Sequence, residues 1–79
     1  MKARVSVTLK SGVLDPQGKA IEGALKSLGV AGVAKVRQGK VFDIELEGSD
    51  RAAAERQLSD ACEKLLANTI VEDYAVDYD

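Results

Sequence analysis

The sequence is short of the residues on which catalytic and metal sites usually depend. Its 79 residues include no histidine, no tryptophan, one cysteine and one proline. A single cysteine excludes an internal disulfide, and without histidine a zinc site would lack its usual ligands. The formal charge of −2 disfavours a nucleic-acid partner, which usually requires a basic surface. We therefore expect no catalytic, metal or cofactor site in this chain.

Long hydrophobic runs are also missing. The first segment, MKARVSVTLK, lacks the apolar run of a signal peptide, and no stretch is long enough to cross a bilayer. We therefore expect a cytoplasmic protein without a membrane partner. Hydrophobic residues still make up 46% of the chain, which is a globular composition. The length predicts a single domain over residues 1–79.

So short a domain buries a modest core, built here mostly from Val, Leu, Ile and Ala. Small domains often gain stability by self-association. We therefore expect a homo-oligomer with twofold symmetry, either a homodimer or a dimer of dimers.

Three segments alternate apolar and polar residues with the period of two that is typical of a half-buried strand. They are residues 2–10, 33–47 and 70–79. The middle segment is interrupted at Gln38 and Gly39, which indicates either a hairpin or one long strand with a bulge. In the last segment, Tyr74, Val76 and Tyr78 share one face.

Residues 14–29 have the apolar spacing of an amphipathic helix. Asp15 is a suitable N-cap, and Pro16 suits the first helical position because no N–H is needed there. Gly29 suits the position after the helix, where a positive φ is common. Gly23 lies inside the helix and indicates a close approach by another chain, tight packing on the sheet, or simple tolerance.

Residues 48–68 predict a second helix, capped by Ser49 or Asp50 and ended by Asn68 in a left-handed conformation. Its predicted apolar stripe consists of Ala54, Leu58, Ala61, Cys62 and Leu65.

The predicted order is β-α-β-β-α-β, which indicates an α+β fold: a two-layer sandwich with a ferredoxin-like antiparallel sheet and two helices on one face. In this topology the last strand lies beside the first. Lys2 and Arg4 would then face Asp73 and Asp77, and the acids Asp43 and Glu45 would flank the first strand on its other side.

No segment carries a convincing catalytic pattern. Cys62 lies late in its helix with no histidine to act as its base, so we expect a buried, inert thiol. Glu72 and Asp73 are consecutive and point to opposite faces of a strand, which disfavours a metal site. The spacing of Gly12, Gly18 and Lys19 fails to match a phosphate loop.

Two interpretations follow from the residues alone. The chain is either a subunit that positions catalytic partners or a small ferredoxin-like regulatory module that binds a metabolite at a subunit interface. Fold by itself does not choose between them.

Two segments, VLDPQGKAIEGAL and CEKLLANTIVEDY, choose between these interpretations. Together they resemble the PurS family, the small subunit of bacterial and archaeal phosphoribosylformylglycinamidine synthase, and the similarity extends over almost the whole chain. The resemblance implies a non-catalytic assembly subunit in de novo purine biosynthesis. It also implies two partners, the glutaminase PurQ and the synthetase PurL, with ATP and magnesium used by the synthetase and no cofactor held by this chain.

Four residues are candidate partner contacts. Arg37 and Lys40 form a basic pair that flanks the predicted hairpin tip of an acidic chain. Tyr74 and Tyr78 lie near the acidic terminus, where aromatic side chains suit the rim of an interface.

Overall fold

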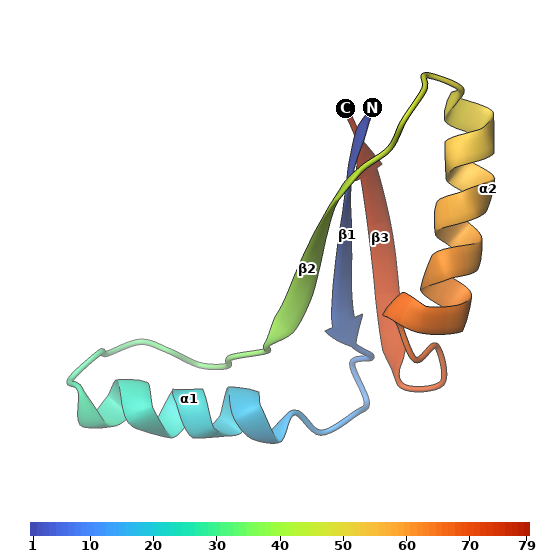
Figure 1. Cartoon of the computed structure of the whole chain (residues 1–79). Coiled ribbons are helices and arrows are strands. Elements are labelled where there is room, and N and C mark those ends of the chain that lie inside the picture. The colour runs from blue at the N-terminus through green and yellow to red at the C-terminus, as the bar shows by residue number, and fades with distance from the viewer.

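The computed structural model describes all of residues 1–79 and consists of a three-stranded sheet with two helices (Figure 1). Its elements, in chain order, are β1 (Lys2–Leu9), α1 (Pro16–Ser27), β2 (Gly39–Glu45), α2 (Arg51–Ala61), a π-helical turn η1 (Cys62–Leu66) and β3 (Glu72–Tyr78). Both helices are too short and too polar to cross a bilayer. The α+β class and the antiparallel sheet are confirmed.

The strands lie in the order β2-β1-β3, and both outer strands are antiparallel to β1. The last strand therefore lies beside the first, as the ferredoxin-like topology predicts. The expected position of Asp73 opposite Lys2 or Arg4 is wrong, because Asp73 stands opposite Thr8. Arg4 stands opposite Asp43 on β2 and Asp77 on β3. The Arg4 Nε atom lies 2.8 Å from Asp43 Oδ1, and the Lys10 Nζ atom lies 2.9 Å from Asp73 Oδ1. Opposite charges across strands thus favour this pairing register.

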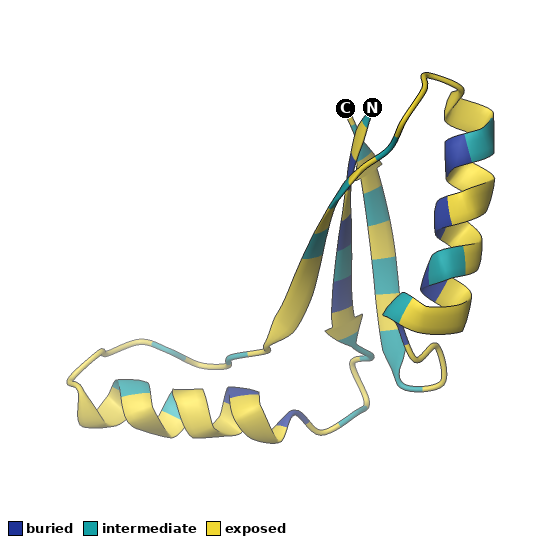
Figure 2. Ribbon diagram, in the orientation of Figure 1, coloured by how far each residue is buried: buried dark blue, intermediate teal, exposed yellow.

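The core lies between β1 and the helix pair α2–η1. Val5, Val7 and Cys62 are fully buried, while the edge strands contribute half-buried side chains such as Phe42 and Val76 (Figure 2). Alternation along β1 places Ala3, Val5 and Val7 on this inner face and leaves the charged residues on the open face. The open face is therefore polar, as predicted.

Residues 33–38 differ from the expectation, because they form neither a hairpin nor a long strand within this chain. The first of the two predicted central strands is absent, and β2 begins only at Gly39. Residues 31–37 make no backbone hydrogen bond at all. The strand-like pattern is present in the sequence, but no strand edge of the same chain lies beside it.

Helix α1 also differs from the expectation, because it does not cover the sheet. It projects away from the strands, so that residues 11–38 form an arm (Figure 1). The Cα radius of gyration is 16.0 Å, whereas a compact domain of this length would have about 12 Å. Only one helix therefore covers a sheet face that has room for two.

The helix ends agree with the sequence in three of four cases. The side chain of Asp15 caps α1, that of Asp50 caps α2, and Gly29 has a φ of 82° after α1. The prediction for Asn68 is wrong, because no non-glycine residue has a positive φ. The chain leaves η1 through an extended Ala67, and Asn68 begins a hydrogen-bonded turn instead.

The predicted stripe on the second helix is wrong at Leu65. The Ala67 N–H donates to the Cys62 carbonyl at 3.0 Å, an i to i+5 bond that widens the last turn. The wider turn places Leu66 against the core and leaves Leu65 81% exposed.

Candidate assembly site

The arm exposes apolar side chains that a helix in this fold would normally bury. Leu14 is 70% exposed, Ile21 37% and Leu28 78%. Because Ile21 and Leu28 lie seven residues apart on α1, they share one face of the helix. The arm therefore carries an apolar helix face without a partner in its own chain.

The inner face of the sheet is only partly covered by helix. Helix α2 lies beside β3, and no helix lies over β2 (Figure 1). Phe42 and Ile44 on β2 remain half-buried although they belong to the core side of the strand. The sheet thus lacks apolar cover on the side of β2.

The base of the arm is held by two charged side chains. The Asp15 carboxylate accepts from the Gly18 N–H at 2.8 Å and from the Gln38 N–H at 2.6 Å. These bonds lower the pKa of Asp15 below its ordinary value, since they stabilise the charged form. Asp15 is therefore more than a helix cap, because it joins the outgoing and the returning ends of the arm.

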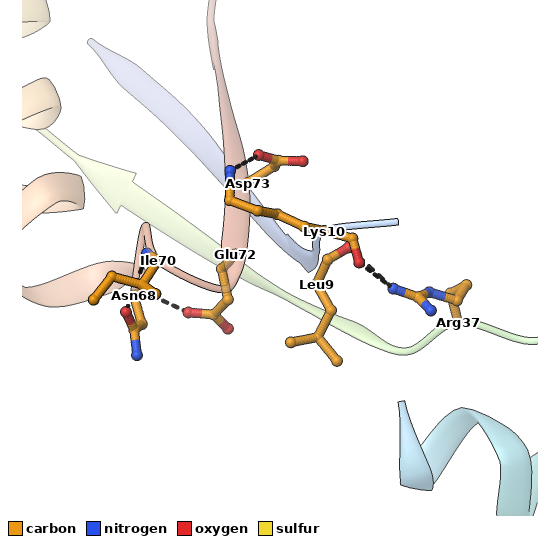
Figure 3. Close-up of polar contacts among 7 residues, drawn as sticks. All are labelled: Leu9, Lys10, Arg37, Asn68, Ile70, Glu72 and Asp73. Carbon is orange, nitrogen blue, oxygen red and sulfur yellow. Dashed lines mark hydrogen bonds and ion pairs between the residues drawn. The ribbon is translucent and has the colours of Figure 1, made fainter. Parts of the chain in front are cut away.

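Arg37, predicted to contact a partner, is engaged within its own chain. Its Nη2 atom donates to the carbonyls of Leu9 and Lys10 at 3.2 and 2.8 Å (Figure 3). Its Nη1 atom donates to the Val13 carbonyl at 3.0 Å. The other predicted cation, Lys40, is not held in this way: its Nζ atom lies 3.9 Å from Glu72 Oε2, and its side chain is 54% exposed.

The predicted tyrosines lie on the inner side of the edge strand β3. Tyr74 packs against the core, and the ring of Tyr78 lies 4.5 Å from the guanidinium carbon of Arg51 at the start of α2. Burial, with the nearby Glu55 carboxylate, raises the pKa of Tyr78. Alternation along β3 brings these two tyrosines onto one face of the strand.

The segment 62–74 is a structural joint. Cys62 is fully buried, and burial raises the pKa of its thiol, so the reactive thiolate is disfavoured. After η1, the Asn68 N–H donates to Glu72 Oε1 at 2.6 Å, and Asn68 Oδ1 accepts from the Ile70 N–H at 3.3 Å (Figure 3). No three metal-ligating side chains converge anywhere in the chain.

Gly18 and the second hydrogen bond of Asp15 are the features that the sequence analysis missed. A Cβ at position 18 would collide with the carbonyl oxygen of Val36, so the returning chain can approach α1 only because residue 18 is glycine. A glycine in the first turn of a helix is unfavourable by itself. A glycine three residues after a capping aspartate could therefore have indicated that another segment of the chain approaches the start of the helix.

Comparisons with known proteins agree on one family. The model of the PurS family, described as phosphoribosylformylglycinamidine (FGAM) synthase, matches residues 2–79. The chain belongs to the PurS family. Its relatives include the PurS subunits of phosphoribosylformylglycinamidine synthase from Archaeoglobus fulgidus and Bacillus subtilis, at 46% and 48% identity. These alignments cover 96% and 92% of this chain and 95% and 86% of the relatives.

Solved structures show the same fold. PurS of Bacillus subtilis in a C2 crystal form aligns with a TM-score of 0.86 at 46% identity, covering 96% of this chain and 94% of that one. A chain in the structure of PurLQS from Thermotoga maritima aligns with a TM-score of 0.87 at 37% identity, covering 96% and 93%. Membership of the PurS family makes this chain a subunit of phosphoribosylformylglycinamidine synthase.

Proposed function

We propose that this chain is the bridging subunit of phosphoribosylformylglycinamidine synthase, a glutamine- and ATP-dependent ligase of purine biosynthesis. It holds the glutaminase PurQ close to the synthetase PurL and has no catalytic residue of its own. The observation that carries this proposal is the match of 96% of the chain to a chain in the PurLQS structure. ATP and magnesium belong to the synthetase, and a cytoplasmic location is part of the proposal because the complex consumes ATP and glutamine.

Omission of the chain tests this function. Ammonia released by the glutaminase must reach the synthetase before it escapes, and tethering raises the effective concentration of one site near the other. Without this chain, glutamine should support little product, whereas ammonium salt at alkaline pH should restore a substantial part. The bridging role would be contradicted if the synthetase with ammonia were as inactive as it is with glutamine.

The proposal includes a twofold homo-oligomer in which the arm of one copy packs on the sheet of another. The accessible surface is 5626 Å², whereas a compact monomer of 8.4 kDa would expose about 4600 Å². The excess of about 1000 Å² is similar to the roughly 800 Å² that each partner buries in a standard interface. The area that this chain leaves uncovered is therefore sufficient for a stable dimer.

The two unpartnered surfaces of the chain support a second copy as the occupant. One copy offers the apolar face of α1, with Ile21 and Leu28, and the other offers the uncovered side of β2, with Phe42 and Ile44. Residues 31–37 additionally offer backbone groups that have no backbone acceptor or donor in their own chain. A reciprocal exchange would satisfy both surfaces at once, as twofold symmetry requires.

Light scattering at micromolar concentration tests the exchange. Leu28→Glu should shift the chain toward the monomer, because it places a charge on the proposed contact face. Leu65→Glu is the matched control: Leu65 is 81% exposed, Leu28 78%, and Leu65 lies outside the arm. A monomeric unsubstituted chain, or equal effects of the two substitutions, would contradict the exchange.

Arg37 and Lys40 remain proposed contacts with the catalytic subunits, and Tyr74 and Tyr78 remain proposed anchors of the homo-oligomer. The exposed ammonium of Lys40 is the best supported of the four, because its contacts within the chain are long: 3.9 Å to the Glu72 carboxylate and 5.8 Å to the centroid of the Phe42 ring. The two tyrosines lie on the edge strand β3, where half-buried aromatic rings suit the rim of an interface.

A further inference from the structure

The angle between the arm and the sheet is set at the base of the arm. Helix α1 does not pack on the strands, so its direction depends on the two crossings where the chain leaves β1 and returns to β2 (Figure 1). The outgoing crossing comprises residues 10–15, and the returning crossing comprises residues 36–39. Two side chains, Asp15 and Arg37, join these crossings.

Asp15 is built into this junction. Its side chain is 5% exposed, and each of its two oxygens accepts one backbone N–H, from Gly18 on the outgoing side and from Gln38 on the returning side. A helix cap needs only the first of these bonds, and serine would supply it equally well. The second bond has no role in capping and serves only to join the crossings.

Arg37 joins the same crossings from the returning side. Its guanidinium donates to three carbonyls of the outgoing chain, those of Leu9, Lys10 and Val13, at 2.8 to 3.2 Å. A lysine donates from a single nitrogen, whereas the planar guanidinium of arginine donates from separate nitrogens and so reaches three acceptors here. Gly18 completes the junction by allowing the Val36 carbonyl to approach.

We infer that Asp15 and Arg37 form a clamp that holds the arm at one angle and so positions α1 for a second copy of this chain. This inference rests on the proposed arm exchange. A clamped arm is preorganised, whereas a loose arm must be ordered during association, which weakens binding without removing any contact surface. In the association of two copies, Asp15 and Arg37 are therefore positioning residues and do not contact the second copy.

Three variants separate positioning from capping and contact. Asp15→Ser keeps a residue able to cap α1 and loses the bond to Gln38. Arg37→Lys keeps the positive charge and loses the planar guanidinium that donates to the three carbonyls. Asp50→Ser is the matched control, since Asp50 caps α2 through a single bond to the Ala53 N–H at 3.1 Å and joins nothing else. Each variant is studied as the full chain, together with the double variant Asp15→Ser, Arg37→Lys.

Sedimentation equilibrium measures the dissociation constant, and amide hydrogen exchange measures the protection of Val5 and Val7 in β1. The two clamp variants should each raise the dissociation constant roughly ten-fold, as the loss of a hydrogen bond to a charged group implies, while protection of β1 stays unchanged. The double variant should raise the dissociation constant by much less than the product of the two single effects. An arm that one substitution has already loosened loses little more order from the second. Asp50→Ser should leave the constant unchanged.

Three results would overturn the clamp: unchanged dissociation constants, fully additive effects, or lost protection of β1 in the single variants. Additive effects would mean two independent contacts, and lost protection would mean general destabilisation. A monomeric unsubstituted chain would instead refute the arm exchange. In that case hydrogen exchange of the Gln38 amide would test the junction alone. The amide should exchange faster in Asp15→Ser than in the unsubstituted chain, and an unchanged rate would overturn the clamp.

Discussion

At the scale of single residues, two glycines of α1 differ in what their surroundings allow. A Cβ at Gly18 would collide with the carbonyl oxygen of Val36, whereas a Cβ at Gly23 would have no heavy atom within 4 Å. The first glycine is required by a close approach within the chain. The second is tolerated by this chain on its own.

Gly18→Ala should therefore destabilise the protein, while Gly23→Ala should stabilise it by about 0.5 to 1 kcal/mol, because alanine loses less entropy in a helix. Urea denaturation of both variants at one protein concentration measures the difference. If Gly23→Ala instead weakened self-association, another chain would approach α1 at that position.

The lowered pKa of Asp15 predicts how the junction responds to low pH. Its pKa is lowered mainly by the bonds from Gln38 and Gly18, and the charge of Arg37 contributes. A carboxyl group whose pKa is lower in the folded state stabilises the fold when the pH is above its pKa in the unfolded chain, near 3.9. This stabilisation is lost as the pH falls through the pKa of the folded state. The junction should therefore be intact at neutral pH and should open only below about pH 4.

The amide proton shift of Gln38, followed from pH 6 to pH 2, measures this opening. The titration midpoint should lie below the ordinary range of aspartate, and Asp15→Asn should abolish it. A midpoint near pH 5 would show that the two hydrogen bonds do not stabilise the carboxylate.

At the scale of elements, the π-helical turn η1 decides which leucines of the second helix belong to the core. Leu58 on α2 is 4% exposed and Leu65 on η1 is 81% exposed, although both fit the apolar spacing of one helix. The extra residue in the turn rotates the chain, so a pattern that assumes 3.6 residues per turn fails after Cys62.

Leu58→Ala should lower the free energy of unfolding of the isolated chain by about 2 to 5 kcal/mol, as other buried leucines do. Leu65→Ala should change it by less than about 0.5 kcal/mol. Urea denaturation at one protein concentration gives both values. A large effect of Leu65→Ala would mean that self-association buries this side chain.

At the scale of the whole molecule, the chain is an elongated body of 48 × 25 × 15 Å with charged residues of both signs on its surface. Lys40 lies where the arm returns to the sheet and retains an exposed ammonium group. A rim charge of this kind acts mainly through the rate of association and its dependence on salt.

Lys40→Glu should slow the association of this chain with the catalytic subunits, and the effect should shrink as salt rises and the charges are screened. Lys64→Glu is the control, because it makes the same change of charge on an exposed side chain of η1. Surface plasmon resonance at two ionic strengths measures both rates. Equal slowing by the two variants would show that net charge matters and that the position of Lys40 does not.

The sequence by itself determined the features that depend on near neighbours. Alternation in β1 and β3, the caps Asp15 and Asp50 and the positive φ of Gly29 follow from local chemistry, and all are present. The pairing of both outer strands with β1 was also predictable, because Arg4 needs acids on both sides and finds Asp43 and Asp77 there.

Only the tertiary structure decided where α1 and residues 33–38 lie. Their local patterns are satisfied equally by packing on their own sheet or on the sheet of another copy, so no local rule distinguishes the two. The decision depends on contacts between residues far apart in the sequence: Asp15 with Gln38, Arg37 with Leu9, and Gly18 with Val36. These contacts turn the arm away from the sheet and leave an apolar helix face and one strand of the sheet uncovered within the chain.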